Sequence, residues 1–186
     1  DTGISNGVVF TIPAPPAVIV TATTPCSGGS STVTATASVS ASYSYAWTVP
    51  AGIVNPGNVA SFSTTAAGNY SVLVSNTATA CSTAVSYTLS VNPLPVVSFT
   101  KPTDSICFST SSQIKTYPLT VVSGTPVRYS VTWNTTLPAI TNATLTGNQI
   151  SVTVPASTAA GTYTGTVIFY TAADCAGLPI PISLTV

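Results

Sequence analysis

Tyr43–Trp47 reads YSYAW, and Tyr129–Trp133 reads YSVTW. In both segments, bulky aromatic or apolar side chains alternate with small or polar ones, and each segment ends on one of the two tryptophans of the chain. A period of two is typical of a β-strand with one buried face. The two segments therefore predict a pair of equivalent strands, each of which directs a tryptophan into a core.

Other signals recur around these strands in the same order. A cysteine precedes each tryptophan, an Ala-Gly-x-Tyr stretch follows it, and a second cysteine comes next. The cysteines are Cys26 and Cys81 in the first copy and Cys107 and Cys175 in the second. Self-similarity of this kind indicates a repeated structural unit. We expect one unit at residues 13–92 and another at residues 93–186.

Residues 1–12 resemble the closing strand of a unit. Gly7–Pro13 reads GVVFTIP, and Ala84–Pro93 reads AVSYTLSVNP. We expect this segment to close a preceding copy, so that the sequence is a window from a longer array. Proline-rich joints between units are stiff, which predicts an extended rod.

The composition restricts the function. The chain has 186 residues, of which three are Lys or Arg, three are Asp or Glu, and none is His; 3% of residues are charged, against about 25% in ordinary soluble domains. A histidine-based triad, a carboxylate pair or a histidine-ligated metal site cannot be built from this set. We expect no enzyme, no catalytic residue, no metal and no cofactor.

We also expect no nucleic-acid partner and no insertion into a membrane. Three isolated cations cannot neutralise a phosphate track. The mean hydropathy is +0.51, but even the longest apolar runs, such as Val167–Tyr170, are short, and a helical span needs about 20 residues. Hydroxyl-bearing Thr and Ser take the place of charged residues at the surface.

The fold class expected from these patterns is all-β. Period-2 runs rich in Thr, Val, Ser and Tyr are separated by 15 prolines and 12 glycines, which favours sandwiches over helical folds. Each unit resembles an immunoglobulin-like β-sandwich. The matching core tryptophans are Trp47 and Trp133, and the matching corner tyrosines are Tyr70 and Tyr163. Val72 and Gly165 stand where antibody domains carry the second cysteine of their inter-sheet disulfide.

Two cysteines per unit predict two disulfides within the units, formed in an oxidising compartment. The expected pairs are Cys26–Cys81 and Cys107–Cys175. Each pair would tie the segment before the second strand to the connection between the last two strands.

The full pattern, Cys-x-Gly-Gly-Ser, Tyr-x-Trp, Ala-Gly-x-Tyr-x-Val and Cys, resembles the Ig-like or PKD-like repeats of giant bacterial surface adhesins that are exported by the type IX system. The resemblance implies a bacterial cell-surface location, adhesion and gliding motility. It also implies neighbouring repeats, surface polysaccharide or other filament subunits as partners. Asp104–Ile106 resembles an O-glycosylation motif, with Ser105 as the acceptor.

Two alternatives stay open. The chain fits a pair of carbohydrate-binding modules if Tyr43, Tyr45 and Tyr129 form an exposed aromatic row. It fits a polymerising filament subunit if residues 1–12 add as a strand to another chain.

Overall fold

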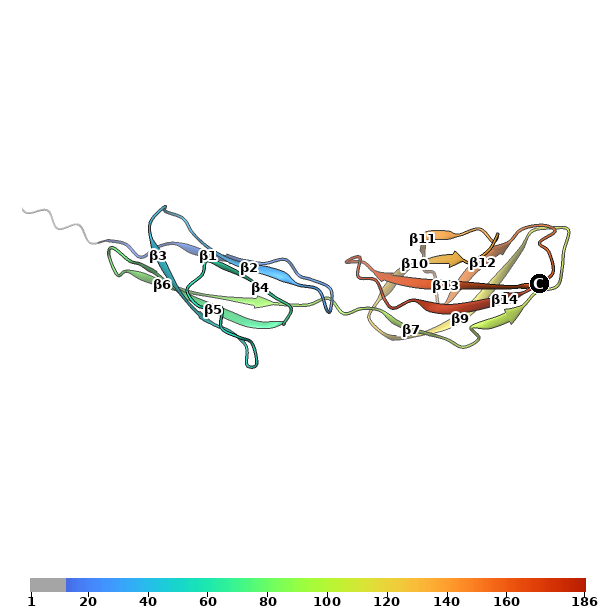
Figure 1. Cartoon of the computed structure of the whole chain (residues 1–186), viewed down its shortest axis with the longest axis horizontal. Helices are drawn as coiled ribbons and strands as arrows, with labels where there is room; N and C mark the ends of the chain where they lie inside the picture. The colour runs from blue at the N-terminus through green and yellow to red at the C-terminus, as the bar shows by residue number, and fades with distance from the viewer. Residues whose placement is uncertain (1–12) are drawn as a thin grey trace, which may run out of the picture. The chain divides into compact units, whose positions relative to one another are not determined.

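The computed structural model describes residues 13–186. The strand expected within residues 1–12 lies outside the described residues. The described part of the chain holds fourteen β-strands and no α-helix, as Figure 1 shows. It divides into two compact units, and the boundary falls between Val91 and Asn92.

The first unit is a sandwich of two three-stranded antiparallel sheets. One sheet has the order β1-β2-β4 and the other β3-β5-β6. The strands are β1 (Val18–Thr21), β2 (Ser31–Ala37), β3 (Tyr43–Thr48), β4 (Ser61–Thr64), β5 (Gly68–Asn76) and β6 (Ser82–Leu89). In immunoglobulin terms, these sheets are A-B-E and C-F-G.

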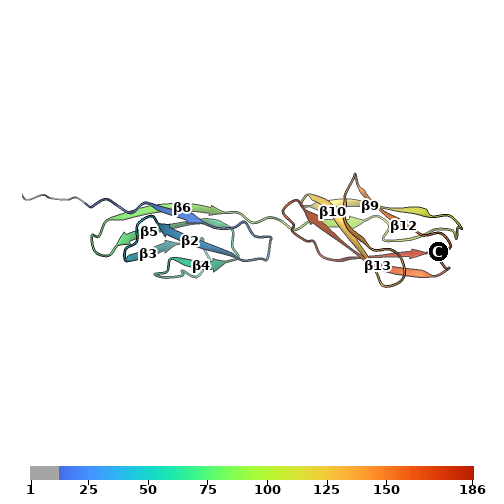
Figure 2. The same cartoon turned by 90° about the horizontal axis from the view of Figure 1, so that it is seen from above.

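The second unit has the same two sheets, one of which carries an added strand at each edge. One sheet has the order β12-β9-β7, and the other has the order β11-β10-β13-β14-β8, with β8 parallel to β14. The strands are β7 (Val96–Phe99), β8 (Thr103–Ser105), β9 (Gln113–Ser123), β10 (Pro126–Trp133), β11 (Ile140–Thr144), β12 (Gln149–Val154), β13 (Thr162–Thr171) and β14 (Ile180–Thr185). Figures 1 and 2 show the strands of each unit from two directions. This arrangement is an immunoglobulin-like sandwich as well.

Alternation along the strands builds the cores. In β12, Ile150, Val152 and Val154 are buried, while Ser151 and Thr153 are exposed. Thr and Val suit such strands because their branched side chains pack well on a pleated surface. Hydroxyls then cover the outer faces that charged residues cover in most proteins.

Each unit has its own core of buried side chains. In the first unit, the Trp47 ring meets Phe62 edge-on, with the ring centroids 4.9 Å apart. In the second unit, Phe169 packs at tilted angles against Phe99 and Tyr129. Aromatic contacts of these geometries stabilise a core beyond the effect of area burial alone.

Candidate functional site

The corner tyrosines make the same hydrogen bond in both units. Tyr70 Oη donates to the carbonyl oxygen of Ala66, and Tyr163 Oη donates to that of Ala159, each at 2.7 Å. Tyr70 is fully buried and Tyr163 nearly so. A hydroxyl that bonds to the backbone four residues upstream fixes the loop into the F strand. Both tyrosines therefore hold the fold and do not face a ligand.

The two tryptophans are buried but differ at the indole nitrogen. Trp47 Nε1 donates to the carbonyl oxygen of Val59 at 2.8 Å. Trp133 Nε1 is buried and has no acceptor among the described residues. Trp133 instead packs on Gly165, where a β-carbon would lie 2.7 Å from the ring atom Cε3. The two tryptophans thus occupy equivalent places in the fold, but only the Trp47 indole N–H has a hydrogen-bond acceptor among the described residues.

The tyrosines that would form a carbohydrate platform are engaged in packing. Tyr129 is buried, and its hydroxyl donates to the carbonyl oxygen of Ser151 at 3.2 Å. Tyr43 and Tyr45 are half-buried against the first core. Within residues 13–186, Phe108 is the one aromatic side chain classed as exposed. The described surface therefore presents no row of aromatic rings.

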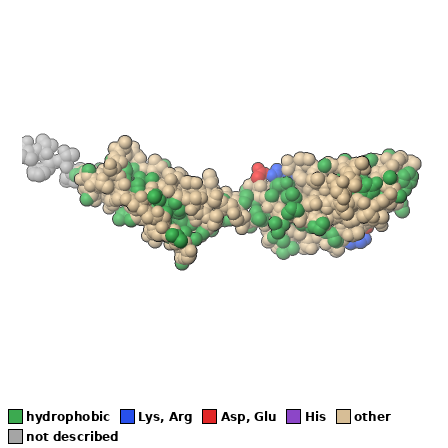
Figure 3. Space-filling model, viewed as in Figure 1, with side chains coloured by type: hydrophobic (Ala, Val, Ile, Leu, Met, Phe, Trp, Pro, Cys, Tyr) green, Lys and Arg blue, Asp and Glu red, His purple; other side chains and the backbone are tan. Residues whose placement is uncertain are grey.

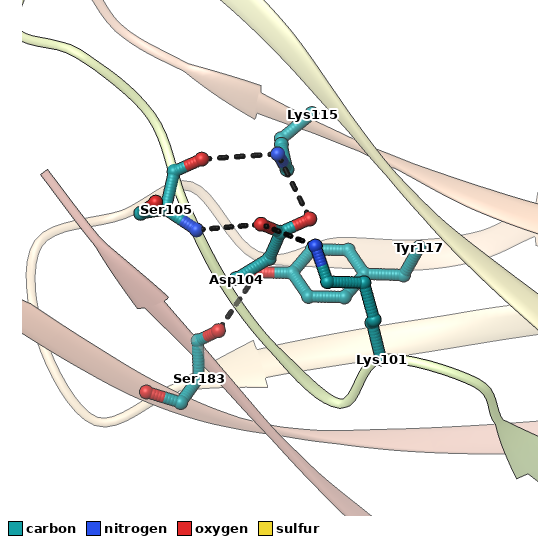
Figure 4. A network of polar contacts seen from close by, with 6 residues as sticks. All are labelled: Lys101, Asp104, Ser105, Lys115, Tyr117 and Ser183. Carbon is teal, nitrogen blue, oxygen red and sulfur yellow. Dashed lines mark hydrogen bonds and ion pairs between the residues drawn. The ribbon is translucent and has the colours of Figure 1, made fainter.

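A small charged network lies on the second unit, at the edge strand β8 (Figure 4). Asp104 Oδ2 lies 2.9 Å from Lys115 Nζ, and its Oδ1 lies 3.4 Å from Lys101 Nζ. The backbone N–H of Ser105 also donates to Oδ1, at 2.8 Å. The Lys115 hydrogen bond, aided by that N–H, lowers the pKa of Asp104 to about 2. The carboxylate is therefore held ionised, and its ion pair with Lys115 ties β8 to β9.

Two further groups complete this network. Lys115 Nζ donates to the carbonyl oxygen of Ser105 at 3.0 Å, so the backbone of Ser105 is held on both sides. Ser105 is exposed, as an acceptor for a sugar must be. Tyr117 lies beneath, and its hydroxyl donates to the carbonyl oxygen of Ser183 at 3.1 Å. Burial, together with the charge of Asp104, raises the pKa of Tyr117 to about 12.

The remaining described charges form a second pair. Arg128 Nη2 contacts Asp174 Oδ1, and the guanidinium lies over the Tyr170 ring at 5.0 Å from its centroid. No residue from Thr2 to Thr100 is charged. The described part of the first unit therefore has a surface of hydroxyl, amide and apolar groups, and the view in Figure 3 shows no blue or red side chain on it.

The state of the four cysteines differs from the expected pairing. Cys81 and Cys107 carry free thiols, whereas Cys26 and Cys175 are disulfide-bonded. The predicted bonds Cys26–Cys81 and Cys107–Cys175 are therefore wrong.

The reason in the first unit is strand direction. Cys81 Sγ lies 3.3 Å from the carbonyl oxygen of Pro13, whereas Tyr87 Oη donates to that of Ala22 at 3.1 Å. The strand from Cys81 to Tyr87 spans about 20 Å at about 3.3 Å per residue. Cys26 lies beyond Ala22, in the loop after β1. A disulfide needs Cα atoms within about 7 Å, so these cysteines lie at opposite ends of the sandwich.

The second unit has the same arrangement. The residue before Cys107, Ile106, donates its N–H to the carbonyl oxygen of Thr185 at 2.9 Å. Thr185 pairs with the first residue of β13, while Cys175 follows the last residue of β13. That strand is about 30 Å long. Cys107 follows β8 and Cys175 precedes β14, which is parallel to β8, so the two cysteines again lie at opposite ends of the sandwich.

The second unit has several surface hollows, of which two differ in character. One of about 400 Å³ is lined by hydroxyl side chains of β10 and β13 and by Asn134, which follows β10, together with Trp133, Gly165 and Pro181. The other, of about 290 Å³, is apolar and is lined by residues before and within β7 and by Leu178 and Ile180. Across residues 13–186, no three His, Cys, Asp or Glu side chains gather as a metal site. No helix in that range is long and apolar enough to cross a membrane.

Known proteins resemble the chain in structure and not in sequence. No protein-family model matches it, and no curated protein matches it at a significant level. The three N-terminal domains of the bacteriophage RB49 Highly Immunogenic Outer Capsid protein match 92% of this chain at 19% identity and a TM-score of 0.47, and the chain spans 58% of that structure's length.

Two further structures are similar at the same level. The fibronectin(III)-like modules of Clostridium thermocellum CbhA match 91% of this chain and 94% of their own, at 14% identity and a TM-score of 0.47. Domains 4 and 5 of the S-layer protein SbsC match 92% of this chain and 98% of their own, at 17% identity and a TM-score of 0.40. At these identities and TM-scores, the likeness carries nothing about function to this chain.

Proposed function

We propose that this chain is a pair of structural repeat modules from a large extracellular adhesin at a bacterial cell surface. The modules act as spacers of an extended filament. The observation behind this proposal is the repetition of one construction: both units have the A-B-E and C-F-G sheets and the same 2.7 Å corner hydrogen bond. Serial repetition of a small sandwich is how many proteins obtain length.

The cysteines support an extracellular place for the modules. Cys26 and Cys175 are disulfide-bonded. Such bonds persist in oxidising surroundings and are rare in reducing ones. An extracellular location is the part of the proposal that this chemistry supports.

The surface supports an adhesive role. A surface without ionic groups, such as that of the described part of the first unit, changes its binding free energy little when salt screens charge. It would keep its contacts in both fresh water and sea water. Type IX export, gliding or attachment, and glycosylation at Ser105 enter the proposal through the sequence resemblance. We propose no catalytic activity.

Antibodies against the two-unit chain test the proposal. Intact cells of the source organism should bind the antibody, and monovalent Fab fragments should reduce attachment of the cells to glass or stop their movement over it. A matched Fab against an abundant, unrelated surface protein controls for crowding. Labelling that requires permeabilised cells would contradict the surface assignment, and labelling without any effect of the Fab would contradict the adhesive role.

A glycan panel separates this proposal from a carbohydrate-binding module. The packed positions of Tyr43, Tyr45 and Tyr129 predict no binding of isolated polysaccharides by stacking. Binding of one glycan that is lost in Tyr45→Ala, with an unchanged melting temperature, would favour the carbohydrate-binding role.

A further inference from the structure

We propose that Cys107 and Cys81 are complementary halves of a disulfide that joins one copy of this two-unit segment to the next, head to tail. The inference deepens the proposed function, on which it rests for the setting, by naming how successive segments are joined. The partner is another module of the same kind, and a second copy of this chain is the probe for it.

The four cysteines fall into two positional classes. Cys26 and Cys107 each follow an early strand, β1 or β8, and precede the B strand of their unit. Cys81 and Cys175 each lie in the hairpin between the F strand and the G strand. In each class, one cysteine is disulfide-bonded and the other is free. The two free thiols thus belong to different classes.

The classes lie at opposite ends of a unit. Cys81 lies beside Pro13, where the described part of the first unit begins. Cys107 lies next to the end of β14, because the neighbouring Ile106 is hydrogen-bonded to Thr185. One free thiol therefore marks the N-terminal end of the first unit, and the other marks the C-terminal end of the second.

The free thiol of Cys81 is held in the same way as its bonded counterpart. The residue before Cys81, Ala80, has a φ of 57°, and the residue before Cys175, Asp174, has a φ of 62°. In both hairpins, Sγ lies 3.8 Å from the carbonyl oxygen two residues upstream. A left-handed residue at both places is uncommon outside glycine. Cys81 thus has the hairpin geometry in which Cys175 forms its disulfide.

The free thiol of Cys107 is accessible and has an apolar neighbour. Cys107 is exposed, and the adjacent Phe108 is 58% exposed. An exposed aromatic ring beside an exposed thiol supplies contact area to a second protein surface, and aromatic residues are enriched where such surfaces meet. Gln113 holds the backbone at Cys107, because its Nε2 donates to the carbonyl oxygen of Cys107 at 3.2 Å.

The joining reaction needs an oxidant, which is a small-molecule or protein disulfide. The thiolate of one cysteine attacks a sulfur of that disulfide and forms a mixed disulfide, and one thiol leaves. The thiolate of the second cysteine then attacks the protein sulfur and releases the other thiol. Two protein thiols lose two protons and two electrons, and the oxidant gains them as two thiols. The product is a Cys107–Cys81 bond between two copies.

The geometry makes the bond directional. A link between two different cysteines leaves one unused Cys81 thiol and one unused Cys107 thiol on the product, so the product can add further copies. A link between two copies of the same cysteine would use up the only reactive sites of single-cysteine variants and end at a dimer. The two kinds of link are therefore distinguishable by product size and by cross-linked peptides.

The experiment starts from unreduced, purified protein with glutathione disulfide as the oxidant. Non-reducing gels should show a ladder, and mass spectrometry should find Cys107 joined to Cys81. Cys81→Ser and Cys107→Ser alone should stop at dimers at most. An equimolar mixture of these two variants should form mixed dimers, which a size tag on one variant distinguishes from the others. Mixed dimers should exceed the fraction of about one half of all dimers that random pairing gives.

A displaced thiol is the matched control. The triple variant Cys81→Ser, Ser82→Cys, Cys107→Ser moves the one remaining free thiol by one residue and turns it to the other face of β6. It should cross-link to the Cys81→Ser variant severalfold more slowly than Cys107→Ser does. If a serine variant fails to fold, alkylation of the wild-type thiols with iodoacetamide should abolish the ladder in its place.

Three results would overturn the inference. They are mixed dimers at or below the random share, equal reactivity of the displaced thiol, and a Cys81–Cys107 link within one chain. None of them depends on where the protein is located in the cell. Failure here with positive surface labelling would leave the proposed function standing, and a ladder with negative surface labelling would leave only the junction.

Discussion

Gly165 lies against the indole ring of Trp133, so closely that a β-carbon on Gly165 would be 2.7 Å from Cε3 and 3.0 Å from Cδ2. The two residues are paired across β10 and β13. In the first unit, Trp47 pairs with Val72 instead. The tryptophan of the second core therefore packs against a glycine backbone, whereas its partner in the first core is a valine.

Gly165→Ala should destabilise the second unit by about 1–3 kcal/mol, because a methyl group forced into a packed core moves its neighbours. Urea unfolding followed by tryptophan fluorescence measures this effect, since each unit holds one tryptophan. Gly161→Ala is the control, because its β-carbon would lie 4.0 Å from its nearest neighbour, in Tyr163. Equal effects of the two substitutions would contradict the close contact.

The corner hydrogen bonds predict unequal costs for removing a hydroxyl. Tyr163→Phe should cost about 1 kcal/mol, the usual net value of one hydrogen bond. Tyr70→Phe should cost more, about 1.5–2 kcal/mol, because Tyr70 Oη also meets the buried Thr64 hydroxyl at 2.9 Å. Tyr43→Phe should stay within about 0.5 kcal/mol, since its bond to Val39 is exposed. If urea midpoints fell further in Tyr43→Phe than in Tyr70→Phe, the corner hydrogen bond would not be a structural constraint.

The indole nitrogens predict a difference between the two tryptophans. Truncation of Trp47 or Trp133 to Ala should cost about 3–5 kcal/mol in either unit. Trp47→Phe should cost about 1 kcal/mol more than Trp133→Phe, because only the former leaves a carbonyl oxygen without its donor. Far-UV circular dichroism during urea unfolding measures both. An equal cost would mean that Trp133 Nε1 finds an acceptor in solution.

Asp104 predicts an acid-sensitive second unit. Its pKa in the folded chain is about 2, below the 3.8 of a free side chain. A carboxyl group with a lowered pKa stabilises the fold above pH 4, and this contribution is lost as the pH falls from about 4 to about 2. Asp104→Asn should lower the melting temperature at pH 7 and abolish that part of the acid dependence. Asp174→Asn controls for the loss of one carboxylate; if it changes the acid limb equally, the network at β8 is not the cause.

Much of the fold follows from local patterns. Alternation is a property of a single strand, so β3, β10 and β12 can be recognised without knowledge of their partners. Trp47 and Tyr70 recur with Trp133 and Tyr163 because a small sandwich needs a large core residue and a fixed corner at set places. The edge strands β8 and β11 are short and carry little alternation, and the sequence gives them no separate signal.

The cysteine pairing could not be predicted in this way. Sequence order shows that Cys26 precedes the B strand and that Cys81 precedes the G strand, but it does not show at which end of the sandwich each lies. That depends on the parallel course of the first and last strands, which is a long-range property. The charged network has the same origin, since Lys115 approaches Asp104 only when β9 passes next to β8.

The absence of charge from Thr2 to Thr100 also determines how proteases meet this chain. Trypsin-like enzymes cut after Lys or Arg, and the first such residue, Lys101, is followed by Pro102, a bond that they cut poorly. The next is Lys115. The first unit would thus survive a trypsin-like enzyme even while unfolded, because the cleavage sites are missing from its covalent structure. Its resistance to that class of enzyme is independent of its thermodynamic stability.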